Sequence, residues 1–488
     1  MKFRETAIVS GGLFVQQLTV FATGTLIARK LGSDAYGILG VLKSLASVVV
    51  IVTALGLDLA LLKQASLYHA KPSEFYAVAR ALRAIVLAVN LALLAAVFLW
   101  FGPMLAGIYE FPAFAMLCVL TMLGVVFATD TQVVSALFRV SDRVVPFALI
   151  VSFGQPIVRL VLSVLALLAG GGVTEIVCIN AIVLLLTYLA IITVDRPARP
   201  SRLVMPVAAL KTKIKSVLSE SVWMATALLV YQMIRLMDVL ILAAITGPRA
   251  AGEYAAMSSV AQLIQIYPNA ISQTLGPQIA LAYDQGDTNG ILEKLRDYLR
   301  KTAILGGLLF GGIAVFGTDL DMVFGSSFNF PWLLCLLLAI GWYLSALLAP
   351  FGYVLSMTGR HQKEVAILAS GAVLLVIGLF VLVPLWQATG AALAVLIAFA
   401  VVNGVRCAYV IRILKHNPLG LKDVAVPAGF FAIAWVCREG GAAMFERGFG
   451  ALVAECMAYL VLAVSFVVVV LVTAEERRML TKFLRRDW

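Results

Sequence analysis

The sequence has few charged residues for a chain of 488: Asp, Glu, Lys and Arg make up 13% of it, against about 25% in an ordinary soluble domain. So little charge cannot cover a globular surface with solvated side chains. Hydrophobic residues make up 62% of the chain, and its mean hydropathy is +1.01. These values exclude a soluble enzyme, a nucleic-acid-binding protein and a disordered chain. They are typical of a helical protein that crosses a membrane many times.

Residues that bind metals or form disulfides are also scarce. The six cysteines lie in or beside apolar runs without a C-x-x-C spacing, and the three histidines are scattered in predicted loops. We expect the cysteines to be small buried hydrophobic residues, and we expect no metal site and no cofactor. Residues 1–5 lead directly into a long apolar stretch without a small-residue cleavage site, so we expect no cleaved signal peptide.

Fourteen apolar runs are long enough to cross about 30 Å of hydrocarbon as helices. The thirteenth run is the weakest, because Arg438 and Glu439 interrupt it. The predicted spans are 6–28, 38–62, 80–101, 113–138, 145–169, 174–194, 217–245, 251–281, 299–317, 330–357, 364–385, 388–412, 423–444 and 449–473.

Basic residues predict the orientation of these spans. If the N-terminus is inside and the spans alternate, almost every Lys and Arg between spans falls in an inner segment. The exceptions are Arg29, Lys30, Arg249, Arg438 and Arg447. Cytoplasmic loops are enriched in Lys and Arg, so we predict a multi-pass protein of the cytoplasmic (inner) membrane with both termini in the cytoplasm. No outer loop is long enough to carry an active site, and we expect the protein not to be an enzyme.

The two halves of the sequence share an ordered set of short motifs. Gly32 and Gly37 follow the first span, and Gly247 and Gly252 follow the seventh, 215 positions later. Further matches at nearly the same offset pair 55–60 with 275–280, 141–143 with 358–360, and Gly154 with Gly371. The repeat unit is six spans, an even number, so both copies have the same orientation and are related by a pseudo-two-fold axis along the membrane normal.

We therefore predict an all-α integral membrane fold with 14 transmembrane helices. Two parallel-repeat six-helix bundles enclose a central cavity, two further helices follow, and the arrangement suits alternating access. The predicted segments are an N-terminal six-helix bundle at 1–200, a basic cytoplasmic linker at 201–216, a C-terminal six-helix bundle at 217–413, helices 13 and 14 at 423–473, and a basic cytoplasmic tail at 474–488.

Polar side chains inside spans are costly and therefore mark candidate sites. Span eight contains a polar stripe whose members recur at steps of four and three and so share one helical face. The stripe consists of Ser258, Gln262, Gln265, Asn269 and Ser272. This face either packs against other helices or lines a watery cavity. Its amides favour the cavity, because helix contacts in membranes prefer small residues. Amide side chains also suit sugar hydroxyls, which need both donors and acceptors. Gln16 begins a shorter stripe in span one.

Charged residues in spans two and seven are further candidates. Arg235 and Asp238 lie three positions apart, with Gln232 one turn before the arginine. They form either an internal ion pair or an arginine that is oriented by the aspartate and offered to an anionic headgroup. Helical phase places Lys43 and Asp58 of span two on similar faces. Both lie near the ends of the predicted span, where snorkelling to the membrane surface is an alternative.

Three more charges lie within spans. Arg159 is in the middle of span five, where it cannot easily reach the membrane surface, and is another candidate cation. Asp130 lies about a third of the way into span four from its cytoplasmic end. Arg406 is close to the inner end of span twelve, and we expect it to be a snorkelling residue.

The stretch Ala28-Arg29-Lys30-Leu31-Gly32-Ser33-Asp34-Ala35-Tyr36-Gly37, together with the repeat and the fourteen spans, resembles a known family. It is the polysaccharide transporter branch of the multidrug/oligosaccharidyl-lipid/polysaccharide flippase superfamily, and the resemblance covers essentially the whole chain. It implies a flippase that moves polyprenyl-pyrophosphate-linked oligosaccharides from the cytoplasmic to the outer leaflet for O-antigen, exopolysaccharide or capsule assembly. The implied partners are the lipid-linked glycan, the bilayer and a polysaccharide polymerase; a single chain suffices to form the cleft.

In that family the first two helices of each half face the cavity, and here these are spans one, two, seven and eight. The expected mechanism is that polar groups replace the water around the sugars and pyrophosphate, cations offset the pyrophosphate charge, and the lipid tail stays in the bilayer. The candidate binding residues are Arg235, Asp238, Lys43, Asp58, Gln16, Gln232, Gln262, Gln265, Asn269 and Arg159.

Two other transport functions stay open. A peptidoglycan lipid-precursor flippase has the same fourteen spans. A cation-coupled multidrug exporter typically has twelve, but Asp58, Asp130 and Asp238 would serve such a protein as proton or sodium sites. A membrane polymerase or glycosyltransferase is disfavoured, because such enzymes usually need a sizeable outer loop with acidic, Arg or His residues.

Overall fold

The computed structural model describes residues 3–64, 67–68, 71–109, 111, 113–195, 206–444 and 448–471. Every regular element in these ranges is a helix, as the all-α fold class predicts. The predicted tail at 474–488 lies outside these ranges, as does the first part of the predicted linker, 201–205. The chain divides into two compact units, Met1–Ala256 with Leu368–Val395 and Met257–Ile367 with Leu396–Trp488.

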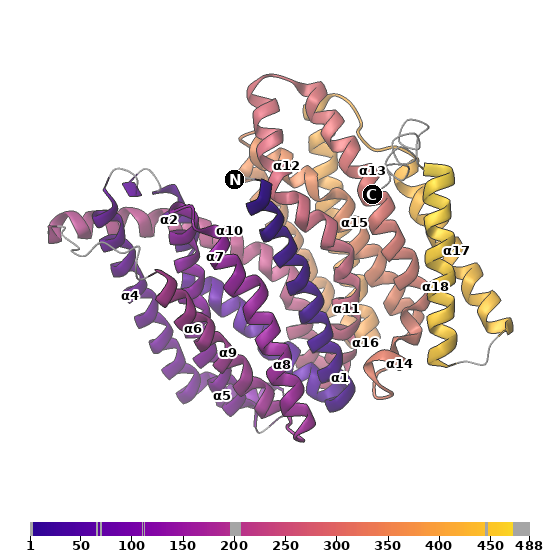
Figure 1. Ribbon diagram of the computed structural model, residues 1–488, viewed down its shortest axis with the longest axis horizontal. Coiled ribbons are helices and arrows are strands. Elements are labelled where there is room, and N and C mark those ends of the chain that lie inside the picture. Colours follow the sequence, from indigo (N-terminus) through magenta and orange to yellow (C-terminus); the bar gives the residue numbers. More distant parts are fainter. Residues whose placement is uncertain are drawn as a thin grey trace, which may run out of the picture. The chain divides into compact units, whose positions relative to one another are not determined.

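The first unit is a bundle of long helices (Figure 1). Its elements are α1 (Phe3–Ala54), α2 (Leu57–Lys63), α4 (Pro72–Ala96), α5 (Gly102–Ile108), α6 (Phe114–Val140), α7 (Val144–Ala148), α8 (Gln155–Leu168), α9 (Val173–Asp195), α10 (Val207–Thr246) and most of α11 (Pro248–Ala261). Helix α6 contacts α1, α4 and α9, and it therefore lies inside the bundle.

Two helices of this unit contain a wider π turn before a proline. The turn at Val97–Phe101 precedes Pro103, and the turn at Leu149–Gly154 precedes Pro156. Proline has no N–H and its ring crowds the preceding turn, so the regular hydrogen-bond ladder is interrupted there. The widened turn accommodates the proline without ending the helix. As a result, α4 continues into α5 and α7 into α8 as membrane-length helices.

The second unit is built around α13 (Figure 1). Its elements are a 3₁₀ turn at Gln262–Gln265, α12 (Ile266–Asp284), α13 (Thr288–Phe316), a 3₁₀ turn at Gly317–Leu320, α14 (Asp321–Phe324), α15 (Trp332–Met357), α17 (Lys422–Met444), α18 (Phe449–Phe466) and a π turn at Val467–Leu471. Helix α13 packs against α12, α15 and α17, and α17 packs against α18. Helix α16 (His361–Leu414) contributes its middle part to the first unit and its ends to the second.

Helices α1 and α16 are each a hairpin that turns at a single non-helical residue. These residues are Gly32 (φ 84°, ψ 178°) and Gln387 (φ 47°, ψ −126°). A Cβ atom added at Gly24 would lie 3.1 Å from the Tyr36 hydroxyl oxygen. In a straight helix, residues twelve positions apart are about 18 Å apart, so the chain must reverse its direction between them.

Each of the fourteen predicted spans corresponds to a helical segment. Within the described part of the chain, nine helical stretches are long and apolar enough to cross a membrane, with α1–α2 and α16 each taken as one stretch. The thirteenth span forms the continuous helix α17 in spite of its charges. Arg438 of that helix pairs with Asp319 at 3.2 Å and donates to the Thr318 hydroxyl at 2.9 Å, so its charge is compensated by the turn that follows α13. The number of crossings stays a prediction.

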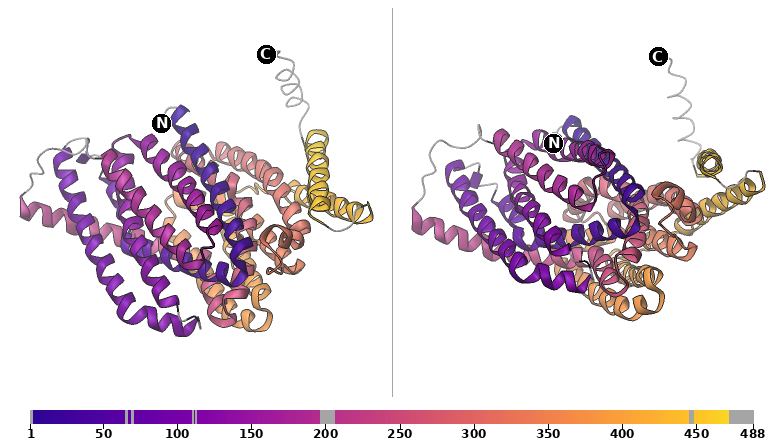
Figure 2. Two further views of the ribbon diagram at one scale, coloured as in Figure 1. Left: turned by 60° about the horizontal axis from the view of Figure 1, so that its bottom comes forward. Right: turned by 90° about the horizontal axis from the view of Figure 1, so that it is seen from below.

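Helix α10 begins before the predicted seventh span. Residues 207–216, predicted as linker, are its first turns, and these project beyond the neighbouring helices of the first unit (Figure 2). Lys211 and Lys215 are exposed there. The described part of the predicted linker is therefore helical and continuous with span seven.

Two arginines of the spans are paired with carboxylates from other helices. Arg83 contacts Asp130 through two hydrogen bonds of 2.8 and 2.5 Å. Arg406 pairs with Glu364, and its Nη1 also donates to the Asn403 side-chain oxygen at 3.1 Å. The expectation that Arg406 snorkels was wrong: its side chain is only 12% exposed and its charge is neutralised inside the protein.

We predict that Glu364→Gln lowers the free energy of unfolding by about 3 kcal/mol, because it leaves the Arg406 guanidinium buried without its carboxylate. Thermal unfolding of the detergent-solubilised protein, followed by tryptophan fluorescence, measures this change. The double variant Glu364→Gln with Arg406→Met should recover part of the loss. As a control, Asp297→Asn removes the carboxylate of the exposed pair with Lys301, and an equal shift in this control would contradict the prediction.

Candidate functional site

The two Gly-x4-Gly segments give the chain the same local shape in both repeats. The first glycine of each is a left-handed turn residue: Gly32 has φ 84° and ψ 178°, and Gly247 has φ 87° and ψ 175°. Residues with a Cβ rarely adopt this conformation. The repeat predicted from the sequence is therefore present in the backbone at these positions.

The second glycine of each segment lies where two helices cross. A Cβ atom added at Gly37 would overlap the carbonyl oxygen of Pro248, and one added at Gly252 would overlap the carbonyl oxygen of Ser33. Only glycine lets two backbones approach so closely. The crossing brings the second arm of α1 into backbone contact with the start of α11 within the first unit.

Three predicted cations of the first unit lie at similar depths. Lys43 stands eleven residues beyond the turn at Gly32, Arg235 twelve residues before the turn at Gly247, and Arg159 nine residues before the end of α8 at Leu168. At 1.5 Å per residue these spacings correspond to about 14 to 18 Å from the ends of their helices, which is about half the thickness of a hydrocarbon layer of about 30 Å. The helical arm that carries Lys43 starts directly after Gly32, before the predicted start of span two at residue 38.

The three cations are also electrostatic neighbours. The charges of Arg159 and Arg235 both act on the Lys43 ammonium group. Lys43 is exposed, and Arg159 and Arg235 are half-buried. Among the described residues, no side chain forms an ion pair or hydrogen bond with Lys43 or Arg159, and Nε of Arg159 is buried without an acceptor. Charges at this depth require an anion or water, so the arrangement suits an anionic ligand.

Asp238 is bound to the neighbouring helix. Its carboxylate is 4% exposed and accepts hydrogen bonds from the Tyr254 hydroxyl at 2.6 Å and from the Val239 N–H at 2.8 Å. The charge of Arg235 acts on it as well. Asp238 therefore joins α10 to α11, and it brings a negative charge to the helix that carries Arg235.

Asp58 is not on the helical arm that carries Lys43. Leu55 (φ 51°) and Gly56 (φ 64°) end α1, so Asp58 belongs to the separate short helix α2, and the helical phase that relates it to Lys43 is interrupted. The expectation of a shared helical face with Lys43 was wrong for this reason. Its Oδ2 accepts a long hydrogen bond of 3.4 Å from the Gln132 amide, while Oδ1 is buried without a hydrogen-bond partner.

The polar stripe of span eight is divided by the 3₁₀ turn at Gln262–Gln265, which shifts its members out of regular helical phase. Gln265 is buried and donates to the Trp342 carbonyl at 3.2 Å, a helix–helix contact inside the second unit. Gln262 donates to the Ser258 hydroxyl at 3.2 Å and stays half-buried, and Asn269 is exposed. A binding role for these residues stays a prediction.

The other two predicted glutamines lie in the first unit. Gln16, in the first arm of α1, and Gln232, in α10, are both half-buried. The hydroxyls of Thr19 and Thr23, which follow Gln16 on its stripe, donate to carbonyl oxygens of their own helix at 2.6 and 2.7 Å. The Gln16 amide therefore has more capacity to bind a ligand than the hydroxyls of Thr19 and Thr23.

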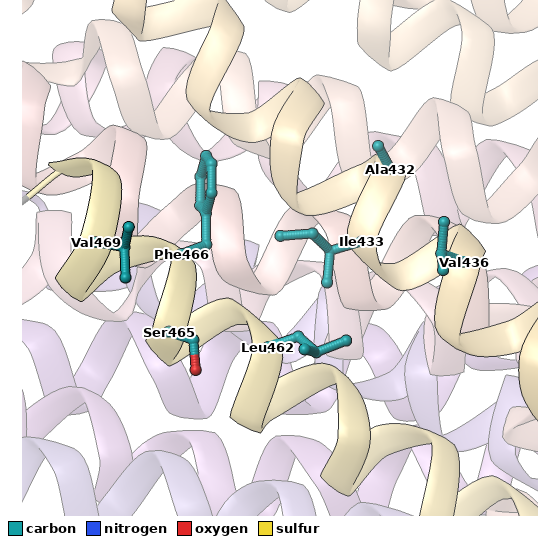
Figure 3. Close-up of a pocket in the computed structure, with 7 residues that line it drawn as sticks. All are labelled: Ala432, Ile433, Val436, Leu462, Ser465, Phe466 and Val469. Carbon is teal, nitrogen blue, oxygen red and sulfur yellow. The ribbon is translucent and has the colours of Figure 1, made fainter.

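An apolar groove of about 450 Å³ lies between α17 and α18 (Figure 3). Its lining residues are Ala432, Ile433, Val436, Leu462, Ser465, Phe466 and Val469. The one hydroxyl, on Ser465, donates to the Val461 carbonyl at 2.8 Å. The groove therefore offers apolar contact and no group that would bind a charged or sugar headgroup.

Sequence reasoning missed the partners of the charged candidates. These partners are distant in the sequence or lie on another helix. They are Glu364 for Arg406, Arg83 for Asp130 and Tyr254 for Asp238. Neither helical period nor hydropathy carries that information. A pattern of paired substitutions among related sequences would have been the signal.

The arrangement of helices is that of known multidrug and lipid transporters. The solved structure of the lipid II flippase MurJ, in an inward closed conformation, matches with a TM-score of 0.70 and 14% identity over 94% of this chain and 98% of that chain. An inward-facing multidrug resistance MATE family transporter of the MOP superfamily matches with a TM-score of 0.65 and 14% identity over 84% and 99%. A MOP superfamily transporter from Pyrococcus furiosus matches with a TM-score of 0.57 and 13% identity over 85% and 96%. The fold is therefore the MOP transporter fold.

The sequence itself identifies the family. Residues 3–281, more than half of the chain, match the model of the family described as polysaccharide biosynthesis protein. The chain belongs to this family, and the resemblance found in the sequence is confirmed. No curated protein sequence matches the chain.

We predict that Tyr254→Phe lowers the free energy of unfolding by roughly 2 kcal/mol, because it leaves the buried Asp238 carboxylate with one donor fewer. The shift in thermal unfolding temperature measures the loss. Tyr283→Phe removes a hydroxyl from a side chain that is 41% exposed and is the matched control. Equal unfolding temperatures for both variants would show that the Tyr254 hydroxyl does not stabilise the fold.

Proposed function

We propose that this protein is a flippase that moves polyprenyl-pyrophosphate-linked oligosaccharide repeat units from the cytoplasmic to the outer leaflet of the inner membrane. The flipped units serve O-antigen, exopolysaccharide or capsule assembly. The observation that carries the proposal is the set of Lys43, Arg159 and Arg235, neighbouring cations within predicted spans, of which two have no carboxylate partner among the described residues. Membership of the polysaccharide biosynthesis family supports the class of substrate.

The pyrophosphate is the part of such a lipid that most needs help to cross. Moving an anion from water into hydrocarbon is prohibitive unless cations and hydrogen bonds replace its hydration. Arginine and lysine form charge-assisted hydrogen bonds with phosphate oxygens. Three cations near the middle of the membrane lower the barrier where it is highest, and the Asp238 carboxylate keeps Arg235 from attracting the anion too strongly for release.

The sugars need amides and hydroxyls rather than charge. Gln16 and Gln232 keep accessible surface in the first unit, and Gln262 and Asn269 keep it in the second. Each of these side chains supplies both donors and acceptors. The lipid tail stays in hydrocarbon throughout. In this mechanism two six-helix bundles open alternately to the two sides of the membrane. The chain crosses the membrane fourteen times with both termini in the cytoplasm, and one chain carries out the cycle. A polysaccharide polymerase receives the unit on the outer side.

A peptidoglycan lipid-precursor flippase is the second candidate, favoured by the match to MurJ over 94% of this chain. Its cargo also combines sugars with a polyprenyl pyrophosphate, so the same cations would serve it. Deletion of the gene separates the two functions. Loss of a surface polysaccharide with normal growth supports the first function, and lysis with accumulated peptidoglycan precursor supports the second.

A cation-coupled drug exporter is favoured by the buried, unpartnered Oδ1 of Asp58 and by the fold of the MATE transporters. In such a protein a carboxylate that gains and loses a proton or sodium ion drives export. Cells that lack the gene would then accumulate a cationic dye, and Asp58→Asn would have the same effect as the deletion.

We predict that Lys43→Gln and Arg159→Gln each reduce export at least about tenfold, since a lost charged hydrogen bond costs roughly 1.5 to 3 kcal/mol and 1.4 kcal/mol is tenfold. The measurement is the amount of surface polysaccharide after each variant replaces the native gene, at matched protein levels in the membrane. Lys301→Gln removes an exposed, paired lysine from α13 and should export normally. Normal export by both Lys43→Gln and Arg159→Gln would refute the proposal.

A further inference from the structure

The contact between the two Gly-x4-Gly segments is self-complementary. Gly37 faces the Pro248 carbonyl, and Gly252 faces the Ser33 carbonyl. At the offset of 215, Ser33 is equivalent to Pro248 and Gly37 to Gly252, so the two contacts are equivalent to one another under the repeat. Gly40 and its own equivalent, Ala255, complete the set, because a Cβ atom at Gly40 would lie 3.5 Å from the Ala255 Cβ. This is the geometry of a two-fold interface inside one chain.

Such a contact is well suited to opening and closing. The carbonyl groups at the contact, of Ser33 and Pro248, belong to helical turns. A carbonyl there accepts from the N–H four residues later in its own helix, so separation leaves these two carbonyls with a partner. Glycine and alanine have almost no side chain to interdigitate, and little apolar area becomes exposed when they part. The attraction is short-range dispersion, which disappears with small displacements.

The crossing lies between one end of the membrane layer and the cation set. Gly37 and Gly40 stand five and eight residues beyond the turn at Gly32, and Lys43 follows at eleven. These spacings place the contact about 8 to 12 Å from the turn and Lys43 about 17 Å from it. With the N-terminus in the cytoplasm, the turn faces the outside, so the contact stands between the cations and the outer surface.

We propose that this glycine crossing is the outer closure of the transport path: it is made in the state described here and comes apart once in every cycle. The proposal rests on the proposed function for its direction of transport. Its geometric part, that the contact limits access to Lys43 from outside, is independent of the substrate.

A disulfide across the crossing tests the need for separation. In a chain without its six native cysteines, Gly40→Cys with Ala255→Cys places the Cβ atoms within the range of about 3.5 to 4.5 Å that disulfides require. Oxidation should cross-link most of the protein and reduce surface polysaccharide export at least tenfold, and dithiothreitol should restore it. The matched control is Gly124→Cys with Ala181→Cys, which joins α6 to α9 inside one repeat at 3.6 Å and should leave export unchanged.

Export by the cross-linked protein at the rate of the reduced protein would overturn the proposal. Failure of the disulfide between positions 40 and 255 to form, while the control disulfide forms, would overturn it as well. Reduced protein that reaches the membrane but never restores the polysaccharide would instead count against the proposed function.

A labelling measurement tests the outer closure without any substrate, and it therefore applies also when the reduced protein does not restore the polysaccharide. Gly37→Ala puts a methyl group against the Pro248 carbonyl and should raise the labelling of a Lys43→Cys reporter by an impermeant maleimide, added outside intact cells, at least threefold. Gly107→Ala, whose Cβ meets nothing within 4 Å, should leave the labelling unchanged. Equal labelling in the two variants would overturn the outer closure.

Discussion

The cost of placing charge in hydrocarbon organises this protein. Arginines 83, 406 and 438 each contact a carboxylate from another element, and these pairs hold helices together inside each unit. Lys43 and Arg159, which also lie within predicted spans, have no such partner among the described residues. This difference between paired and unpaired cations is the reason why we propose Lys43 and Arg159 as binding groups for an anion from outside the chain.

Glycine has an equally specific part in the architecture. Gly32 and Gly247 supply left-handed turns that reverse the chain within one residue, and Gly37 and Gly252 supply a surface flat enough for two backbones to touch. The turn residues fix where the helical arms begin, and hence the depth at which Lys43 and Arg235 stand. The same four glycines thus determine both the repeat symmetry and the position of the candidate anion site.

Much of the fold could be predicted from the sequence, because hydropathy and repeats report on the membrane and on the backbone. The weak span at 423–444 is a helix, and the offset of 215 recurs in backbone angles. The sequence was less informative where tertiary contacts decide. Arg406 near a span end looked like a snorkelling residue, since its partner Glu364 is 42 positions away. The helical arm that carries Lys43 begins before the predicted span, because hydropathy does not register that a helix can start directly after a glycine turn. Gln265 gave no sign that its amide would donate to the Trp342 carbonyl.

The claim that the unpaired cations bind a lipid-linked pyrophosphate is tested most directly by the affinity of the purified protein for three lipids that share one polyprenyl chain and end in pyrophosphate, monophosphate or a free hydroxyl. Native mass spectrometry of the protein in detergent measures all three. The account predicts the tightest binding for the pyrophosphate and loss of that preference in the Lys43→Gln/Arg159→Gln double variant. Equal binding of the three lipids, or a preference that survives the double substitution, would contradict it.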